Sequence, residues 1–194
     1  MHSAPNFKVD DLVWIQKLVT DHPLGWISAW VHGQVDSHPV PLIWTERGLV
    51  GHLLASHDWA GLSLGQVSVS FTGVSGYISP NAYPSKQQDP RVVPTYNYQA
   101  AVVRGKLKWL QSNDQKLSVL NALTDHFEQV EPHPWSINDA PEDYIERMLA
   151  GIVAFCIEPS EIQGKSKMSQ NQSQQNRAGV KAWAPDQLSV LIDR

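Results

Sequence analysis

Hydrophobic and polar residues alternate strictly in residues 66–73, QVSVSFTG. Val67, Val69 and Phe71 would face one side of a strand, with Ser and Thr on the other side. Other segments are short, rich in β-branched and aromatic residues and bounded by turn residues, which also indicates strands. These segments are residues 24–31, 35–44, 49–55 and 92–110, the last of which predicts one long strand or two joined strands.

Apolar residues recur at helical spacing in a few further segments. Residues 12–22 predict a short helix, and residues 114–130 predict a longer one. Asp139 with Glu142 resembles a capping box that opens a helix over residues 140–152. The longer helix would carry one buried stripe made of Leu117, Leu120, Leu123 and Phe127.

The order of these elements predicts an α+β fold. Strands follow one another at hairpin spacing without a regular strand–helix–strand alternation, which favours antiparallel pairing in a closed or partly open barrel. The apolar run at residues 152–159 predicts a central strand, and residues 187–193 predict a weak terminal helix. We found no internal repeat and no long linker, so we expect a single domain over residues 1–194 with a C-terminal helical tail.

Composition and charge exclude several classes of protein. The net charge of −4 argues against a broad surface that binds nucleic acid through its phosphates. The lone cysteine, Cys156, excludes an internal disulfide or a multi-cysteine zinc site, and its apolar surroundings predict a buried, inert thiol. The first residues lack the features of a signal peptide, and no apolar run reaches about 20 residues. We therefore expect a cytoplasmic protein with no membrane partner.

The segment from Tyr77 to Tyr98 contains four prolines and four tyrosines. Prolines prevent it from forming one regular helix or one central strand. Its phenol rings, together with Lys86 and Arg91, could hold a planar, phosphorylated ligand, because rings stack and cations bind phosphate. The alternative is a tyrosine- and proline-rich loop packed over the end of a barrel. Composition alone leaves both interpretations open.

A second polar segment runs from Gly164 to Val180. On a strand, Lys165 and Lys167 would share one side, and Ser173 would cap the next helix. This segment could form a polar rim that donates hydrogen bonds to the phosphate or ring carbonyls of a ligand. A solvated turn is the alternative. The polar residues at the end of the strand are Ser169, Gln170 and Asn171.

Three histidines suggest another kind of site. His38, His52 and His57 could together bind zinc or iron. However, neither an HxH nor an HExxH spacing is present, and isolated histidines are more often ordinary core or surface residues. The sequence also lacks GxSxG, P-loop and GxGxxG motifs, so no motif indicates a catalytic residue.

Four motifs follow one another along the chain: YISPNAYPSK, VVPTYNY, APEDYIERMLAGIVAF and GKSKMSQNQSQQNRAGV. In this order they resemble the PaiB family of FMN-binding negative transcriptional regulators, and the likeness runs from about Phe7 to about Val180. The resemblance implies a split β-barrel similar to pyridoxamine-phosphate-oxidase-like flavoproteins, with flanking helices. It also implies a homodimer that binds FMN between its subunits.

The resemblance also implies which residues bind the cofactor. FMN needs cations and hydroxyl groups for its phosphate and hydrogen-bond donors near its pyrimidine carbonyls, while the redox chemistry belongs to the flavin. The expected cofactor-binding residues are His52, Tyr83, Lys86, Thr95, Asn97, Tyr98, Lys165, Ser169, Gln170 and Asn171.

Three functions remain open from the sequence. The first is a flavin-linked regulator that represses through DNA or through a regulatory protein partner. An acidic chain without a recognition helix is poorly suited to bind DNA sequence-specifically by itself. The second is a flavin-dependent oxidoreductase that acts on a small molecule. The third is a metal-binding enzyme built on the three histidines.

Overall fold

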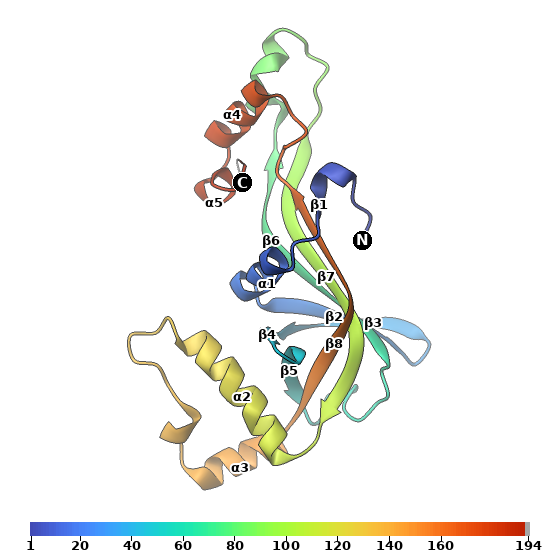
Figure 1. Cartoon of the computed structure of the whole chain (residues 1–194), viewed down its shortest axis with the longest axis vertical. Coiled ribbons are helices and arrows are strands. Elements are labelled where there is room, and N and C mark those ends of the chain that lie inside the picture. The colour runs from blue at the N-terminus through green and yellow to red at the C-terminus, as the bar shows by residue number, and fades with distance from the viewer. Residues whose placement is uncertain (193–194) are drawn as a thin grey trace. The chain divides into compact units, whose positions relative to one another are not determined.

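The structure is a computed structural model that describes residues 1–192 (Figure 1). Its strands are β1 (Lys8–Val9), β2 (Leu24–Val31), β3 (Gln34–Pro41), β4 (Ile43–Thr45), β5 (Gly48–Leu54), β6 (Gln66–Ile78), β7 (Thr95–Leu110) and β8 (Ile152–Lys167). Its α-helices are α1 (Leu12–Asp21), α2 (Asn113–Glu128), α3 (Glu142–Ala150), α4 (Gln174–Trp183) and α5 (Asp186–Ser189). Short 3-10 helices are η1 (Pro5–Phe7), η2 (Pro80–Ala82), η3 (Pro84–Gln87) and η4 (Ile137–Asp139).

Hydrogen bonding orders the strands as β3-β2-β6-β7-β8-β5-β4, with β1 also pairing with β8. The pairs β1–β8, β2–β3, β2–β6, β4–β5 and β5–β8 are antiparallel. The predicted strand segments all form strands, but residues 35–44 contain two strands, β3 and β4, instead of one. They are separated at Leu42, whose backbone N–H donates to the Pro23 carbonyl (2.9 Å). Residues 92–110 contain one strand rather than two. Strand β8 lies between β7 and β5, so its predicted central position is confirmed. The α+β class is confirmed as well.

Contacts divide the chain into two compact units. Unit 1 comprises residues 1–21 and 72–102 and the described residues from 163 onward, and unit 2 comprises residues 22–71 and 103–162. The single domain over residues 1–194 stays a prediction. Helix α5 occupies part of the predicted terminal helix, whose last residue, Asp193, lies outside the described residues. Among residues 1–192, no helix is long and apolar enough to cross a membrane.

In unit 2, the alternation along β2 and β3 separates a core side from an exposed side. Ile27, Ala29 and Val31 on β2 are buried, as alternate residues of a strand should be. The other side carries large apolar side chains in solvent, and it also carries a hydrogen bond between the hydroxyl groups of Ser28 and Ser37 (Oγ–Oγ 2.8 Å). We call this side the tryptophan face; its exposed apolar residues are Leu24, Trp26, Trp30 and Val35.

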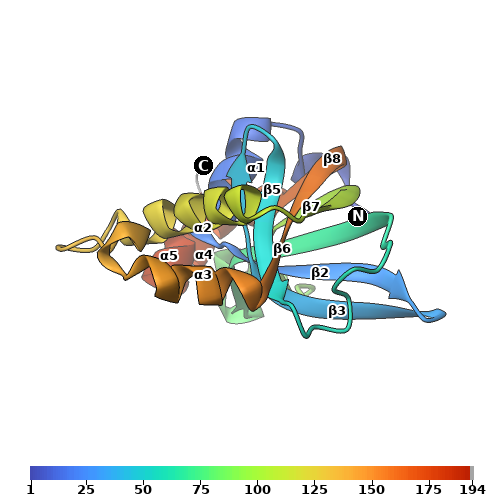
Figure 2. The same ribbon diagram turned by 90° about the horizontal axis from the view of Figure 1, so that it is seen from below.

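Helices α2 and α3 belong to unit 2, where α2 contacts α3 and packs along β4 and β5 (Figure 2). The first turn of α2 is fixed by a capping box between Ser112 and Gln115. The predicted stripe is partly wrong, because Val119 and Leu123 are the buried residues of α2 while Phe127 is exposed. The helix therefore turns a slightly different face to β5 than simple spacing suggested.

The predicted capping box at the start of α3 is wrong. Asp139 instead pairs with Ser136, whose backbone N–H donates to Asp139 Oδ2 (2.8 Å) at the start of η4. Pro141 occupies the N-cap position of α3, and Glu142 stands in the first turn. There it interacts favourably with the positive end of the helix dipole.

Cys156 lies in the core of unit 2, as predicted. Its thiol donates to the backbone carbonyl of Arg47 (Sγ–O 3.0 Å), and burial raises its pKa. A thiol with a raised pKa forms little of the nucleophilic thiolate, so this cysteine is suited to packing rather than reaction.

Candidate functional site

The predicted cofactor-binding residues are concentrated in unit 1. Only His52 belongs to unit 2, where it is exposed on β5. Within unit 1 the others fall into two groups. Tyr83 lies between η2 and η3, and Lys86 lies within η3. The rest lie on β7, on β8 or in the turn that follows β8.

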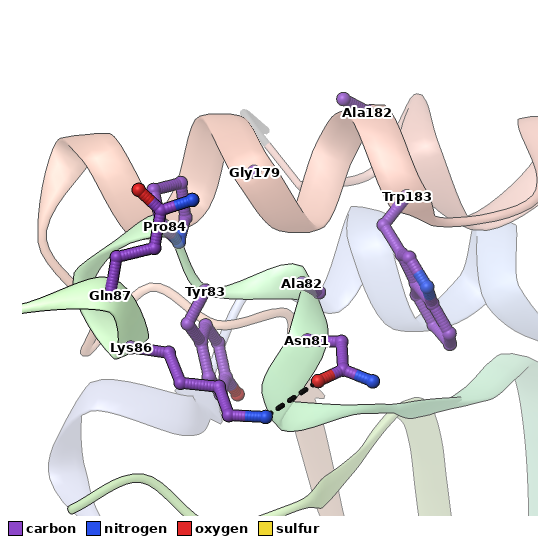
Figure 3. Close-up of a pocket in the computed structure, with 9 residues that line it drawn as sticks. All are labelled: Asn81, Ala82, Tyr83, Pro84, Lys86, Gln87, Gly179, Ala182 and Trp183. Atoms are coloured by element: carbon purple, nitrogen blue, oxygen red, sulfur yellow. Dashed lines mark hydrogen bonds between the residues drawn. The ribbon is translucent and has the colours of Figure 1, made fainter. Parts of the chain in front are cut away.

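Tyr83 and Lys86 line a pocket of about 650 Å³ between the η2–η3 segment and α4 (Figure 3). We call it the Lys86 pocket. Figure 3 shows Trp183 extending from α4 at one end and Lys86 and Gln87 at the other. The remaining lining residues are Asn81, Ala82, Pro84, Gly179 and Ala182.

The local sequence explains why this segment forms two short helices instead of a long one. Pro80 and Pro84 each start a 3-10 turn, where a proline needs no N–H partner. The Ser79 side chain caps the first turn by accepting from the Asn81 backbone N–H (3.2 Å). The prolines that exclude a regular helix therefore build the compact wall of the pocket.

Helix α4 approaches this wall closely because residue 179 is glycine. A Cβ atom at position 179 would lie 2.3 Å from the Ala82 carbonyl oxygen and 2.5 Å from Pro84 Cδ. The wall is also tied to α4 by a hydrogen bond from the Ser85 backbone N–H to Asn176 Oδ1 (3.2 Å). A side chain at position 179 would push α4 away from η2 and η3.

The lining of the pocket combines a cation, amides and an exposed ring. Lys86 Nζ donates to Asn81 Oδ1 (2.6 Å), and Gln87 adds a second primary amide. The Trp183 indole is substantially exposed, whereas the Tyr83 ring is buried, which raises the pKa of its phenol. The phenol therefore stays neutral and packs under the pocket, while the ammonium, the amides and the indole remain accessible to a ligand.

The second group forms side-chain pairs between the start of β7 and the end of β8. The Asn97 amide donates to Ser169 Oγ (2.9 Å), and both residues are buried. Lys167 donates to Thr95 Oγ1, and Lys165 Nζ lies 5.2 Å from the centre of the Tyr98 ring. Since buried polar groups need partners, these pairs hold the two strands together.

The turn after β8 is organised by its own side chains. Ser169 has a left-handed backbone (φ 63°), and the Gln170 side chain hydrogen-bonds the backbone of Met168 and of Ser166 (2.6 Å each). Ser173 caps α4 by accepting from the Asn176 backbone N–H (3.2 Å), as predicted. Asn171 is exposed at the outer edge of this turn.

Unit 2 contains a separate group that we call the histidine cluster, formed by Asp36, His38, His57 and Trp59. The rings of His38 and His57 meet edge to face with centroids 4.4 Å apart. Asp36 Oδ2 accepts from Trp59 Nε1 (2.9 Å) and lies 3.1 Å from His38 Nε2. Both hydrogen bonds lower the pKa of Asp36, and the bond from Trp59 has the larger effect. Residues 1–192 contain no group of three or more His, Cys, Asp or Glu placed to hold a metal ion.

Sequence reasoning missed Trp183, Asn81 and Gln87 in the Lys86 pocket. Asn81 lies within the YISPNAYPSK motif, so that motif could have indicated it. Trp183 is about 100 residues away along the chain, and only the glycine inside the α4 sequence hints that this helix packs closely against another segment.

Residues 1–161 of the chain match the family described as "Putative FMN-binding domain". An uncharacterized protein of Emericella nidulans is 30% identical over 149 residues, which are 69% of this chain and 59% of that protein. An uncharacterized relative from Aspergillus fumigatus is matched over 46% of its length, so the chain spans about half of these fungal proteins.

The Bacillus subtilis "Protease synthase and sporulation protein PAI 2" is 26% identical over 186 residues, which are 93% of this chain and 87% of that protein. Together with the family match, this confirms the resemblance to the PaiB family.

Solved structures show the same fold. The flavocytochrome Anf3 from Azotobacter vinelandii matches with a TM-score of 0.66 and 13% identity, over 91% of this chain and 78% of that one. The FAD and heme binding protein from Mycobacterium smegmatis matches with a TM-score of 0.60 and 19% identity, over 82% of this chain and 73% of that one. The predicted split β-barrel fold is confirmed.

Proposed function

Since this chain belongs to the family of FMN-binding domains that its residues 1–161 match, we propose that it binds FMN in the Lys86 pocket. The pocket volume of about 650 Å³ lies in the range of volumes of pockets that bind small molecules and cofactors. The observation that carries the proposal is the combination of the Lys86 ammonium and the Trp183 indole in one pocket, since the cofactor combines a phosphate with a flat ring system.

The residues present fit such a ligand. Lys86 supplies positive charge for the phosphate, and Asn81 and Gln87 supply amide donors and acceptors for polar atoms. Trp183 offers a ring face for stacking. When bound, the flavin supplies the redox chemistry, and the protein orients it and controls its access to water.

The other predicted residues divide by their position. We propose that the pairs Asn97–Ser169 and Thr95–Lys167, together with Lys165 and Tyr98, position β7 and β8 rather than touch the flavin. Gln170 and Asn171 remain predicted flavin contacts, because both are exposed in unit 1. His52, on β5 in unit 2, stays a prediction from the resemblance alone. Single alanine variants of Gln170 and Asn171 should each weaken FMN binding, and an unchanged affinity removes that residue from the site.

The central experiment is a titration of the flavin-free protein with FMN and, in parallel, with FAD, followed by flavin fluorescence. We expect saturable binding of FMN, weaker binding of FAD, and at least about tenfold weaker FMN binding for Lys86→Ala, because hydrogen bonds to charged groups contribute about 1.5–3 kcal/mol. Lys106→Ala, which removes an exposed lysine of β7 in unit 2, is the matched control and should bind as the wild type does. Equal affinities of wild type and Lys86→Ala would place the flavin elsewhere.

We also propose that the protein forms a homodimer through the tryptophan face. Trp26 is 52% exposed and Trp30 67% exposed, and Leu24 and Val35 extend the same apolar surface. Aromatic residues are enriched in protein interfaces, and a contiguous apolar patch of this kind marks an interaction site. Each chain has a mass of 21.7 kDa, so light scattering should give about twice that value.

The dimer is tested with charged variants. Trp30→Lys should shift the mass toward one chain, because a buried, unpaired ammonium disfavours the interface. Val13→Lys changes an equally exposed apolar residue on α1, outside the tryptophan face, and should leave the dimer intact. A wild-type protein that is monomeric at high concentration would exclude this interface.

For the biological role, we propose a negative regulator of transcription in the cytoplasm, as the resemblance implies. With a net charge of −4, repression through a regulatory protein partner is favoured over direct DNA binding. Operator binding that weakens steeply with salt would instead indicate direct contact with DNA. Bleaching of the bound flavin by NAD(P)H, followed by turnover of a small molecule, would favour the alternative of a flavin-dependent oxidoreductase.

A further inference from the structure

A second, smaller pocket lies in unit 1 and shares no lining residue with the Lys86 pocket. It measures about 200 Å³, and α1 forms one side of it. Its floor and walls come from β7, β8 and the residues after α5. The lining residues are Trp14, Lys17, Leu18, Asp21, Gln99, Ser166 and Leu191.

The amide of Gln99 is the unusual feature of this pocket. Gln99 is only 9% exposed, and its side chain makes no hydrogen bond to any residue in the described part of the chain. Neither polar atom of this amide is among the fully buried atoms that lack a partner, so the amide remains accessible to water or to a ligand. Since the residue lines the pocket, the amide is accessible from that side.

Two neighbouring side chains in the pocket are also available to a ligand. The Trp14 indole N–H and the Ser166 hydroxyl make no hydrogen bonds within residues 1–192. The charged residues at the pocket are already paired, because Lys17 Nζ donates to Asp21 Oδ1 (3.0 Å). The pocket therefore combines an aromatic ring, two aliphatic side chains and neutral polar groups, with no unpaired charge among its described residues.

We propose that this pocket binds an uncharged, single-ring aromatic compound that carries an amide group. An amide on the ligand can accept from and donate to the Gln99 amide at the same time, which satisfies both of its polar atoms. The ring would pack against Trp14 and Leu18, and such aromatic contacts are favourable beyond their burial. The volume equals about seven waters at about 30 Å³ each, which suits one ring with a small substituent.

The inference does not depend on flavin binding, and the test uses nicotinamide as the probe. Saturation-transfer NMR on the full chain should show saturable binding of nicotinamide. Benzoate and benzylamine, which carry a charged substituent on a ring of the same size, should bind more weakly. Gln99→Leu keeps the size of the side chain and removes the amide, so it should weaken nicotinamide binding about tenfold or more. Ser166→Trp should abolish binding by filling the pocket.

Two variants serve as controls. Ser166→Ala leaves the pocket open and should reduce binding by no more than a few fold. Lys86→Ala changes the other pocket and should leave nicotinamide binding unchanged. Gln99→Leu should in turn leave FMN binding unchanged, and thermal unfolding of each variant checks that it folds.

Three results would overturn the proposal. One is the absence of saturable nicotinamide binding to the wild-type protein, which would mean that water alone satisfies the Gln99 amide. Another is equal binding by wild type, Gln99→Leu and Ser166→Trp. The third is a parallel loss of FMN and nicotinamide binding in Gln99→Leu, since that would make the amide part of the flavin site.

Discussion

The Lys86 pocket and the histidine cluster contain similar kinds of side chain but use them differently. Each places an aromatic residue next to ionisable and hydrogen-bonding groups. In the histidine cluster, Asp36 accepts from the buried indole of Trp59 and meets His38, so the polar groups satisfy one another. In the Lys86 pocket, the Trp183 ring is exposed and the lysine has one hydrogen bond to a neighbouring amide.

A stabilising cluster and a binding site can be told apart by whether their polar groups are paired with each other. Groups that satisfy each other contribute to the free energy of unfolding, and removing one leaves its partner unpaired. Groups that remain accessible contribute little to stability and are available to a ligand. Variants in the histidine cluster should therefore change stability, whereas polar variants in the Lys86 pocket should change affinity.

The largest effect is expected from Gly179→Val, which attacks the packing that forms the Lys86 pocket. The new side chain would collide with the backbone of Ala82 and with Pro84, neither of which can move freely. Overpacking of this kind costs typically about 1–3 kcal/mol, and we expect a loss near the upper end of that range. Denaturant unfolding measures it.

Ala178→Val is the control for Gly179→Val, since it places the same side chain on α4 at an exposed position. It should cost less than about 1 kcal/mol, the difference in helix propensity. If the two variants were equally stable, α4 would not be seated against η2 and η3 through position 179.

The second effect concerns the partner of the Trp59 indole. Asp36→Ala leaves the N–H of a fully buried indole without an acceptor, which should cost about 1–3 kcal/mol. Asp36→Asn keeps an oxygen acceptor and should recover most of the loss. Calorimetric unfolding of both variants checks this, and an Asn variant no better than the Ala variant would show that the indole bond is not the cause.

A smaller effect should appear as a pH dependence of the same cluster. Burial lowers the pKa of His57, and the neighbouring charge of His38 lowers it further, although Asp36 and Asp58 oppose this. A histidine with a lowered pKa binds fewer protons in the folded protein than in the unfolded chain. Stability should therefore be fully present above about pH 6.5 and decrease as the pH falls through the folded pKa of His57.

The measurement is the unfolding midpoint between pH 8 and pH 5. Asp36, whose pKa is also lowered, contributes only at more acidic pH, near and below its ordinary value of 3.8. His57→Asn keeps an acceptor for the Trp59 backbone N–H and removes the titration. Its midpoint should therefore change less over this pH range, and an unchanged pH dependence would assign the effect to another group.

The fold could be predicted well where one periodic pattern was sufficient. Strand β2 begins and ends at the predicted residues, because exposed and buried residues alternate along it without interruption. Strand β6 continues beyond residue 73 to Ile78, where the sequence VSGY no longer alternates clearly. Hydrogen bonding to a neighbouring strand can extend a strand where the side chains give no such signal.

The helices show the limit of spacing alone. Phe127 fits the predicted stripe of α2 and yet is exposed, since the position of the helix against β4 and β5 selects Val119 and Leu123 instead. Asp139 and Glu142 have the spacing of a capping box, but the Asp139 side chain instead accepts a hydrogen bond from the Ser136 backbone N–H. Several residues can fit one local sequence pattern, and the contact that forms depends on which residues are neighbours in the folded structure.

The candidate site was predictable only in part for the same reason. Tyr83 and Lys86 came from one recognisable motif and lie together in the pocket. Asn97 and Ser169 also came from motifs, but they are buried against each other, which no motif reveals. Trp183 and Gln99 carry no sequence signal, because their importance depends on surfaces that only folding creates.

The smallest effect on stability is expected from Lys86→Ala. The lysine is exposed, and within residues 1–192 its side chain makes one hydrogen bond, to the exposed Asn81, so the free energy of unfolding without flavin should change by no more than about 0.5 kcal/mol.

FMN binding should then separate the two proteins. With FMN at about 100 times the wild-type dissociation constant, the free energy of unfolding of the wild type should increase by about 2.7 kcal/mol. A variant that binds FMN ten times more weakly should be stabilised by only about 1.4 kcal/mol under the same conditions. Thermal unfolding with and without FMN measures both numbers, and Asp36→Asn, which alters the other cluster, should gain as much from FMN as the wild type. A Lys86→Ala protein that is unstable without FMN but gains fully from it would reverse the assignment of this pocket as a binding site.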